Sequence, residues 1–388
     1  MEVCAVRTRS ELAEFIGFPY DLHRGSPFWV PPLIGEQKRL LNRKEHPFFD
    51  FGSVELFLAR HDGRTVGRIA AVDNPNFNDF HGTQDGFFGL FECVDSPDVA
   101  RGLFGAVRDW LGKRQLTTLS GPVNFSTNYE CGMLTKGFDR LPAIDMAYNP
   151  PYYPDLMAEC GLDTAMELLA WEVPVPFHEN ARTQRLVQMI RSRINVRIRP
   201  VDLSAFGEET ARIKDIYNSA WERNWGFSPM TDREFGALAK RLRQLIRSEL
   251  CLIVEVDEEP VAFAVALPDI SAALAAAKGR LHTWGFPLGL VRLMRAQRRS
   301  DRLRLVTMGI RKEFRGRGIA PLLLDELSKA ASDLGYSEME FSWVLATNDD
   351  ANQGIKAILD GRAEIAKKYH IYRGPVLSET SISSEELV

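Results

Sequence analysis

The sequence lacks the residue patterns of several common classes of protein. Five cysteines occur in 388 residues, an odd number, and none of them forms a CxxC pair. This usage is typical of reduced cytosolic thiols and argues against a disulfide framework or a zinc site. The seven histidines show no HxxxH or HExxH spacing, so we expect no metal ion in the protein.

Long apolar runs are also missing. No stretch is long enough to span a bilayer, and the start MEVCAVRTRSELAEF contains no hydrophobic region of a signal peptide. We therefore expect a cytoplasmic protein that has no membrane partner. The hydrophobic and charged fractions, 45% and 26%, are ordinary for a soluble enzyme, and the length favours two domains.

Positive charge is scarce in the first half. Residues 1–175 contain 16 Lys+Arg against 24 Asp+Glu, whereas 176–388 contain 32 against 28. An anionic ligand is therefore expected in the second half of the chain.

Strand and helix patterns alternate along the chain, which predicts an α/β (α+β) fold. The patterns indicate hairpins at 54–73 and 249–269, strands at 86–94, 116–123, 165–173, 195–203, 303–310, 337–345 and 367–374, and helical segments at 96–112, 153–160, 206–248 and 319–334. Both halves repeat a similar order, which indicates an internal duplication. The proline-containing segment 173–184 is the expected junction between domains 1–175 and 176–388.

The run FRGRGIA at 314–320 is the strongest motif in the sequence. It lies between an expected strand and a helix with an apolar stripe, so its glycines fall at a strand-to-helix turn. Unpaired amides and the positive dipole end make such a helix start a site for anions. The chain has no GxxxxGK[ST] loop, and GRGIAP lacks the third glycine of GxGxxG. These features favour a phosphate-binding turn over a solvated basic loop.

The six residues 315–320 match the R/Q-x-x-G-x-G/A signature of the GCN5-related N-acetyltransferase (GNAT) superfamily. The segment LVTMGIRKEFRGRGIAPLLLDEL resembles that family's fourth strand and third helix, and FSWVLATNDDANQGI resembles its fifth strand and the following helix start. The resemblance covers 195–374 well, and over 54–173 it concerns only the order of elements. The chain thus resembles tandem GNAT proteins, with a degenerate domain at 1–175 and an acetyl-CoA site at 176–388. Each domain is expected to be a mixed twisted sheet flanked by helices.

The resemblance implies a co-substrate, acetyl-CoA, and a set of residues that contact it. Backbone amides of the turn would hold its pyrophosphate, strand edges its pantetheine arm, and an asparagine would contact it from the next element. In this order the residues are Arg315, Gly316, Arg317, Gly318, Ile319 and Ala320, then Met308, Gly309 and Ile310, then Asn348 or Asn352. The implied reaction is direct attack of an amine on the thioester.

The sequence departs from the family at the general acid. A tyrosine is often found about seven residues after the asparagine, but here those positions hold Ile355 and Leu359. Tyr369, Tyr372 or water are left as proton donors. Glu338 and Glu340 alternate on one strand face, and Glu340 is the candidate base, whereas Glu338 fits an edge or solvent face better.

Other residues admit both a structural and a functional interpretation. Tyr217, Trp221 and Trp225 recur at helical spacing, which fits a core stripe or, with Asn224, an acceptor-binding pocket. The loops 120–134 and 148–156, rich in Asn, Pro and Tyr, fit packed connectors or binding loops equally well.

The insertion 272–304 is apolar and then basic. Its arginines at 295, 298, 299 and 302 fit a membrane-surface or nucleic-acid patch, but a helical lid with a solvated basic face is favoured. No nucleic-acid partner is expected.

The whole pattern predicts an N-acetyltransferase that moves an acetyl or longer acyl group from CoA to an amine of a small molecule or peptide. Two alternatives remain open at this point. One is an aminoacyl transferase of the cell-wall peptide type, which would not need the pyrophosphate turn. The other is a regulatory protein that binds acyl-CoA without turnover.

Overall fold

The computed structural model describes residues 1–177, 181–193, 195–222, 224–280, 288–297, 300–359 and 362–377. The chain forms two compact units. The first comprises Met1–Leu168, Leu274–Val291 and the stretch from Lys368 onward, and the second comprises Leu169–Ala273 and Arg292–Lys367. The units do not coincide with the two continuous segments expected from the sequence, because the last strand pairs with strands of the first unit.

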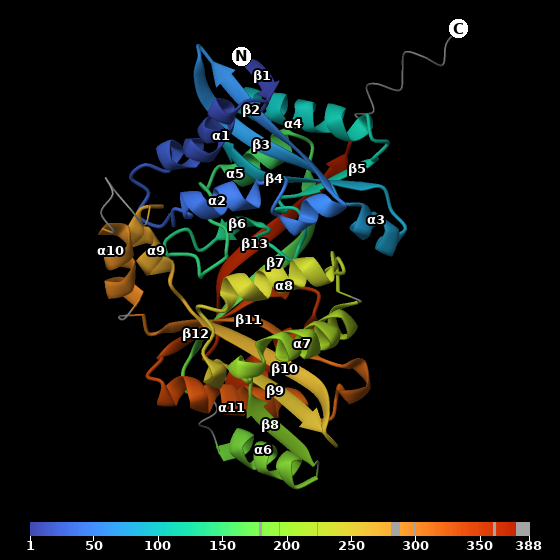
Figure 1. Cartoon of the computed structure of the whole chain (residues 1–388), viewed down its shortest axis with the longest axis vertical. Coiled ribbons are helices and arrows are strands. Elements are labelled where there is room, and N and C mark those ends of the chain that lie inside the picture. Colours follow the sequence, from blue (N-terminus) through green and yellow to red (C-terminus); the bar gives the residue numbers. More distant parts are fainter. Residues whose placement is uncertain are drawn as a thin grey trace. The chain divides into compact units, whose positions relative to one another are not determined.

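The first unit is built on a mixed sheet with the strand order β1-β2-β3-β4-β5-β13, and β6 also pairs with β13 (Figure 1). These strands are β1 Glu2–Ala5, β2 Ser53–His61, β3 Arg64–Asp73, β4 Asp85–Cys93, β5 Thr118–Gly121, β6 Met133–Lys136 and β13 Glu364–Pro375. Its helices are α1 Arg9–Leu22, α2 Ile34–Leu40, the 3-10 turn η1 Pro47–Asp50, α3 Pro75–His81, α4 Pro97–Gly112 and α5 Tyr153–Glu159.

Helix α4 confirms the helix expected at 96–112. Its residues Val99, Leu103, Val107 and Leu111 are buried, and their spacing of four places them on one face against β3 and β2. Ser96 occupies the N-cap position with an extended backbone, but its side chain makes no capping hydrogen bond. Helix α4 thus covers the first sheet through the stripe that the sequence shows.

Both expected hairpins are present. Strands β2 and β3 turn at Asp62 and Gly63, whose φ angles are 49° and 73°. Strands β9 Cys251–Val256 and β10 Glu259–Pro268 turn at Asp257 and Glu258, with φ of 51° and 69°. Two successive positive φ values match the tight turn that suits the right-handed twist of paired strands.

The second unit contains a sheet with the order β12-β11-β10-β9-β8. Its strands are β7 Asp163–Pro174 from Leu169 onward, β8 Val196–Pro200, β9, β10, β11 Arg302–Ile310 and β12 Glu338–Leu345. Its helices are α6 Ala181–Arg193, α7 Phe206–Trp221, α8 Asp232–Leu242, α11 Ile319–Asp333 and α12 Asp349–Leu359, with the 3-10 turns η2 Leu203–Ala205, η3 Ser248–Leu250 and η4 Lys312–Phe314. Helices α9 Ser271–Ala277 and α10 Leu288–Gln297 each contain a boundary between the units.

Strand β10 shows how this sheet separates two cores. Ala262, Ala264 and Ala266 belong to the core that includes residues of α11, whereas Phe263 and Val265 belong to the core on the α7 and α8 side. All are nearly or fully buried, so the strand reads as a continuous apolar run. Helix α11 and the pair α7 and α8 therefore cover opposite faces of the sheet.

The helical region expected at 206–248 is not one helix. Helix α7 ends at Trp221, and α8 begins at Asp232 after a segment that contains Gly226 with φ 71°. Thr231 starts α8 with a capping box, because its hydroxyl accepts from the Glu234 amide and the Glu234 carboxylate accepts from the Thr231 amide. Trp225 consequently lies outside the helix that carries Tyr217 and Trp221, which corrects the expected single stripe.

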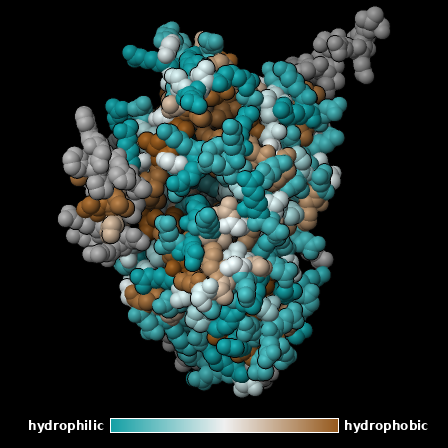
Figure 2. All heavy atoms as spheres, in the orientation of Figure 1, coloured by the Kyte–Doolittle hydropathy of each residue, from teal (hydrophilic) through white to brown (hydrophobic). Residues whose placement is uncertain are grey.

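All five cysteines are free thiols, as the sequence predicts, and four of them are buried. Burial raises the pKa of the Cys251 thiol to about 12. The surface in Figure 2 is largely hydrophilic, although patches of apolar residues show on it.

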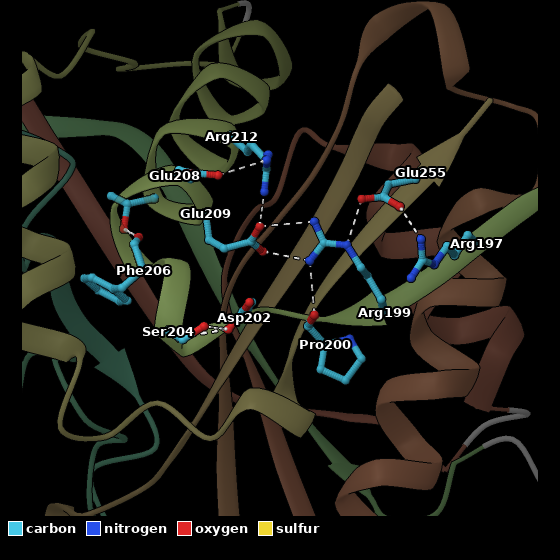
Figure 3. A network of polar contacts seen from close by, with 11 residues as sticks. Arg197, Arg199, Pro200, Asp202, Ser204, Phe206, Glu208, Glu209, Arg212 and Glu255 are labelled. Carbon is cyan, nitrogen blue, oxygen red and sulfur yellow. Dashed lines mark hydrogen bonds and ion pairs between the residues drawn. The ribbon is translucent and has the colours of Figure 1, made fainter. Parts of the chain in front are cut away.

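A charged network fixes the start of α7 against the edge of the second unit's sheet (Figure 3). Arg199 of β8 donates to both carboxylate oxygens of Glu209, at 2.8 and 3.1 Å, and to Glu255 of β9 at 2.7 Å. Arg212 also pairs with Glu209. Burial alone would raise the pKa of Glu209, but the two arginines outweigh it and hold that pKa below its usual range. The network sets the position of α7, whose far end carries Tyr217 and Trp221.

Candidate functional site

The FRGRGIA run forms the turn between β11 and α11, as predicted. Gly316 and Gly318 have φ of 72° and 85°, a left-handed backbone that disfavours other residues. Within the described residues, the backbone amides of 316–320 have no hydrogen-bond partner, and the first amide of α11 to bond is that of Leu322, to the carbonyl of Gly318. Five open amides at one helix start are the donors that an anionic group needs.

The two arginines of the turn have different environments. The Arg315 guanidinium donates to the carbonyls of Ile310 and Ala220, so it fastens the turn to the last residues of β11 and α7. Arg317 is exposed and its guanidinium lies 5.0 Å from the centre of the Phe314 ring. Both arginines are exposed, but the Arg315 guanidinium already donates to two carbonyls, so Arg317 is the better placed of the two to contact a bound anion.

Helix α6 backs the turn. A Cβ atom at Gly318 would lie 2.8–3.1 Å from side-chain atoms of Ile190, whereas a Cβ atom at Gly316 would meet nothing within 4 Å. Gly318 is thus required for close packing as well as for its backbone conformation, and Gly316 faces open space.

Strands β11 and β12 pair only at their beginnings. The parallel register joins Arg302–Leu305 to Glu338–Phe341 and stops there among the described residues. Beyond it, Met308, Gly309 and Ile310 pair with β10 on their other side, after an extra residue at Val306 shifts the register. The backbone edge of these three residues toward β12 is therefore open, directly before the glycine turn.

Aromatic side chains gather where the two strands separate. Tyr217 stacks on Trp221 with ring centres 5.4 Å apart, and Trp221 meets Trp343 of β12 edge to face at 6.5 Å. All three are half-buried, as are Asn224 and Trp225 in the turn after α7. The helix therefore brings Tyr217 and Trp221 together, and Trp343, to which the sequence reasoning assigned no role, joins them from β12.

Three buried polar atoms in this region have no hydrogen-bond partner within the described residues: Asn218 Oδ1 on α7, Thr307 Oγ1 on β11 and Glu340 Oε1 on β12. Thr307 lies two residues beyond the point where the strands cease to pair, and Glu340 lies just before it. Buried polar atoms are normally hydrogen-bonded, so orphaned atoms point to water or to a ligand.

Glu340, the candidate base, is half of a buried ion pair. Lys367 Nζ donates to Glu340 Oε2 at 2.7 Å, and both side chains are 1% exposed. Arg304 faces Glu340 across the β11–β12 register and donates to the hydroxyl and carbonyl oxygens of Ser342, at 3.0 and 3.2 Å. Lys367 and Arg304 thus place positive charge on two sides of the Glu340 side chain.

Glu338, two residues earlier, does not face open solvent. It pairs with Arg302, and Arg302 also donates to Glu172 of β7 at 3.1 Å. Burial and the neighbouring Glu172 carboxylate raise the pKa of Glu338 to about 7 despite the arginine. The expected solvent face is wrong for this residue, which belongs to a half-buried pair of acids sharing one arginine.

The two asparagines after β12 are engaged within the protein. Asn348 caps α12, since its side-chain oxygen accepts from the Ala351 amide at 3.1 Å. Asn352 is buried; its Oδ1 accepts from the Trp171 indole at 3.0 Å and its Nδ2 donates to Leu345, Ala346 and Asn348 carbonyls. Asn352 therefore stabilises the end of β12, and its amide is saturated.

The candidate acids Tyr369 and Tyr372 lie on β13 in the first unit. Tyr369 is fully buried, and Tyr372 belongs to the core that α4 covers. Burial raises the pKa of Tyr372 to about 12, so its phenol keeps its proton at neutral pH.

The first-unit loops 120–134 and 148–156 are packed against each other. Asn149 bonds to both the amide and the carbonyl of Leu134, at 2.6 and 3.1 Å, which ties loop 148–156 to loop 120–134. Nearby, Glu92 accepts from the Tyr153 hydroxyl at 2.7 Å and contacts His23 at 2.8 Å. Sequence reasoning missed His23 and Glu92, since neither belongs to a local motif.

Comparisons with known proteins bear on this geometry. The profile of the acetyltransferase (GNAT) family matches residues 210–354, which contain the turn and the separating strands. The chain is 36% identical over 357 residues to a protein named bacterial ceramide synthase from Caulobacter vibrioides, covering 90% of this chain and 91% of that protein. It is 32% identical over 369 residues to Protein YghO from Escherichia coli, covering 94% and 93%.

Solved structures resemble the fold over nearly the whole chain. A tandem GNAT protein from the clavulanic acid biosynthesis pathway has a TM-score of 0.54 at 13% identity, covering 97% of this chain and 99% of its own. A GCN5-related N-acetyltransferase from Sphaerobacter thermophilus has a TM-score of 0.53 at 12% identity, covering 97% and 96%. The predicted tandem α/β architecture is confirmed.

None of the helices in the described residues has the length and apolar character needed to cross a bilayer. Within the same residues no group of three or more His, Cys, Asp or Glu side chains is arranged to hold a metal ion.

Proposed function

Because the chain belongs to the GNAT family of acyltransferases, we propose that it transfers an acyl group from acyl-CoA to an amine and so forms an amide. The observation that carries the proposal is the set of five open amides at 316–320, placed directly after the open edge of β11. A diphosphate fits such a helix start, because amide donors and the helix dipole both favour negative charge.

The remaining contacts to the CoA substrate follow from the same elements. Arg317 is accessible and adds a cation beside the amides, whereas Arg315 holds the turn in place. The edge at Met308, Gly309 and Ile310 offers backbone donors and acceptors to the amide groups of the pantetheine arm. In this proposal Asn348 and Asn352 act by fixing the end of β12, since their side chains already have protein partners.

The chemical step needs positioning and two proton transfers. The amine nitrogen attacks the thioester carbon, a C–N bond forms, the C–S bond breaks, the nitrogen loses a proton and the CoA thiolate gains one. The open atoms Asn218 Oδ1, Thr307 Oγ1 and Glu340 Oε1 are suited to hold the amine, or the water that accepts its proton. Of the proton donors expected from the sequence, Tyr369 and Tyr372 belong to the first unit, so this proposal uses water as the donor to the thiolate.

The acceptor and acyl chain are proposed from the relative named bacterial ceramide synthase. A ceramide is the amide of a fatty acid with a long-chain amino alcohol, so the same chemistry here would join a fatty acyl-CoA to a lipidic amine. The half-buried rings of Tyr217, Trp221 and Trp343 support an acceptor with an apolar chain. This replaces acetyl transfer to a polar amine as the reaction we favour.

A two-way substrate panel tests the proposal. Acetyl-CoA and a long-chain acyl-CoA are each combined with a polar amine and with a detergent-dispersed long-chain amino alcohol, and free thiol and amide product are followed. We expect amide in greatest amount from the two long-chain partners. Faster acetylation of the polar amine would contradict the lipid assignment, and the absence of amide from every pair would contradict acyl transfer itself.

A further inference from the structure

Helix α10 exposes an unusual concentration of large apolar side chains. Eight such residues are exposed in the described part of the chain, and four of them lie on this ten-residue helix. They are Leu288, Leu290, Val291 and Met294, which are 50%, 36%, 43% and 50% exposed. Leu290 and Val291 lie four and three residues before Met294, so these three share a face of the helix. Figure 2 shows apolar surface at the position where Figure 1 labels α10.

The segment around α10 has charge of one sign only. Between residues 271 and 300 the sequence contains six Lys or Arg residues and no Asp or Glu. Lys278 and Arg280, which follow α9, are exposed. The whole chain has a formal net charge of −4, so this segment is a positive region on an acidic protein.

We propose that α10, together with the exposed basic residues Lys278 and Arg280 before it, binds the surface of an anionic lipid bilayer, with the apolar face of the helix inserted among the lipids. Apolar side chains beside concentrated basic residues are the features of interfacial helices. The length fits this mode and excludes a span, because ten helical residues extend only about 15 Å, roughly half of a bilayer core.

A nucleic acid is the other polyanion that a basic segment attracts. Its phosphates would engage the charges but would leave Leu290, Val291 and Met294 in water, because stacking on bases uses aromatic rings. A bilayer accounts for both features, and so it is the partner that the exposed side chains favour. The lid with a solvated basic face, preferred from the sequence, accounts for the charges but not for the exposed leucines.

The chain before α10 is held in place at Gly279, within the first unit. The Gly279 carbonyl accepts from the Ile34 amide at 3.0 Å, and a Cβ atom there would meet Tyr20 and the Pro32 carbonyl within 3.2 Å. Lys278 and Arg280 flank this contact, so the basic residues are presented from a supported turn. If the acceptor is a lipid, as the proposed function has it, membrane binding would bring the enzyme to its substrate. This last step alone rests on the proposed function.

Vesicle co-sedimentation tests the proposal without requiring catalysis. The probes are phosphatidylcholine vesicles with and without phosphatidylglycerol, at low and high salt, and the protein is the full chain. The test variant is Leu290→Glu with Met294→Glu, and Phe80→Glu is the matched control, since Phe80 is also exposed, at 40%, on a different helix. A second variant, Lys278→Gln with Arg280→Gln, removes the positive charges of two exposed residues before α10.

We expect wild type and Phe80→Glu to sediment with the anionic vesicles. The double glutamate variant should partition at least about tenfold less, because burial of even one leucine or methionine is worth about that factor. The double glutamine variant should lose about fivefold per charge removed. Unchanged circular dichroism and thermal melting show that the variants fold.

Two results would overturn the proposal. One is that wild type and the double glutamate variant bind the anionic vesicles equally, or that neither of them binds. The other is that an oligonucleotide displaces the protein from vesicles and binds the double glutamate variant as tightly as wild type, which would assign the segment to nucleic acid. Acyl transfer to the detergent-dispersed acceptor is measured in parallel, so loss of membrane binding and loss of the proposed activity are told apart.

Discussion

The buried Lys367–Glu340 pair gives a sharp stability prediction. Substitution of Lys367 by Met removes the partner at 2.7 Å and leaves a carboxylate that is 1% exposed. Its second oxygen already has no partner within the described residues. We therefore expect a large loss in the free energy of unfolding.

The magnitude follows from what would surround Glu340 in the variant. Loss of one partner of a buried ion pair typically costs about 3–5 kcal/mol. Arg304 lies opposite Glu340 in the strand register and leaves some positive charge nearby, which argues for the lower part of that range, about 3 kcal/mol. Adding Glu340→Leu removes the stranded charge, so the double variant should regain most of the loss.

Urea unfolding of wild type, both single variants and the double variant measures this coupling. The exposed pair Arg101–Asp98 is the control, and Asp98→Asn should change stability by under about 1 kcal/mol. If Lys367→Met proves too unstable to fold, the double variant must still fold near wild-type stability. A cost of under about 1 kcal/mol for Lys367→Met would refute the reasoning, because the pair would then behave as a solvated one.

Three further predictions follow from the described contacts. Glu209→Gln should lower the free energy of unfolding at pH 7 by about 1–3 kcal/mol. The difference between variant and wild type should shrink below about pH 4, because a carboxylate whose pKa is lowered in the folded state loses its contribution as the pH falls through that pKa. Urea titrations at several pH values measure this difference. Gly316→Ala should cost about 1–2 kcal/mol from its left-handed backbone, and Gly318→Ala more, because its Cβ also meets Ile190; thermal melts rank the two. A thiol reagent should label Cys251 only after denaturant is added, because burial raises its pKa to about 12; mass spectrometry reads the labelling.

The phosphate-type turn could be predicted because every feature of it is local. The glycines, the apolar stripe of α11 and the strand before it lie within one continuous segment, and each has its own physical signature. The direction of Arg315 could not be predicted, because its partner carbonyl belongs to Ala220, 95 residues earlier. The same reason hides the packing of Ile190 against Gly318.

The sequence contains local capping signals that mark two helix boundaries better than apolar periodicity does. Apolar periodicity across 206–248 suggested continuous helix, but Gly226 and the Thr231–Glu234 capping box mark a break. Helix α1 likewise begins with a capping box, from Thr8 to Glu11, which the sequence reading passed over. Capping residues were the better guide to helix ends.

The buried charges were the least predictable part of the site. Lys367 and Glu340 are 27 residues apart and meet only through the sheet. One signal was available: alternation on β13 places Lys367 on the face that carries Tyr369 and Ile371, both buried. A lysine on an apolar strand face needs a buried acid, and Glu340 is that acid.

The central claim is that open amides at the start of α11 bind the diphosphate of CoA, and Ala320→Pro tests it most directly. The substitution removes one amide donor in a first helical turn that already accommodates Pro321. Calorimetry with CoA should show affinity about tenfold or more weaker than wild type, since a hydrogen bond to a charged group is worth about 1.5–3 kcal/mol. Pantetheine, which lacks the diphosphate, should bind both proteins alike. Equal CoA affinity in a folded Ala320→Pro variant would contradict the claim.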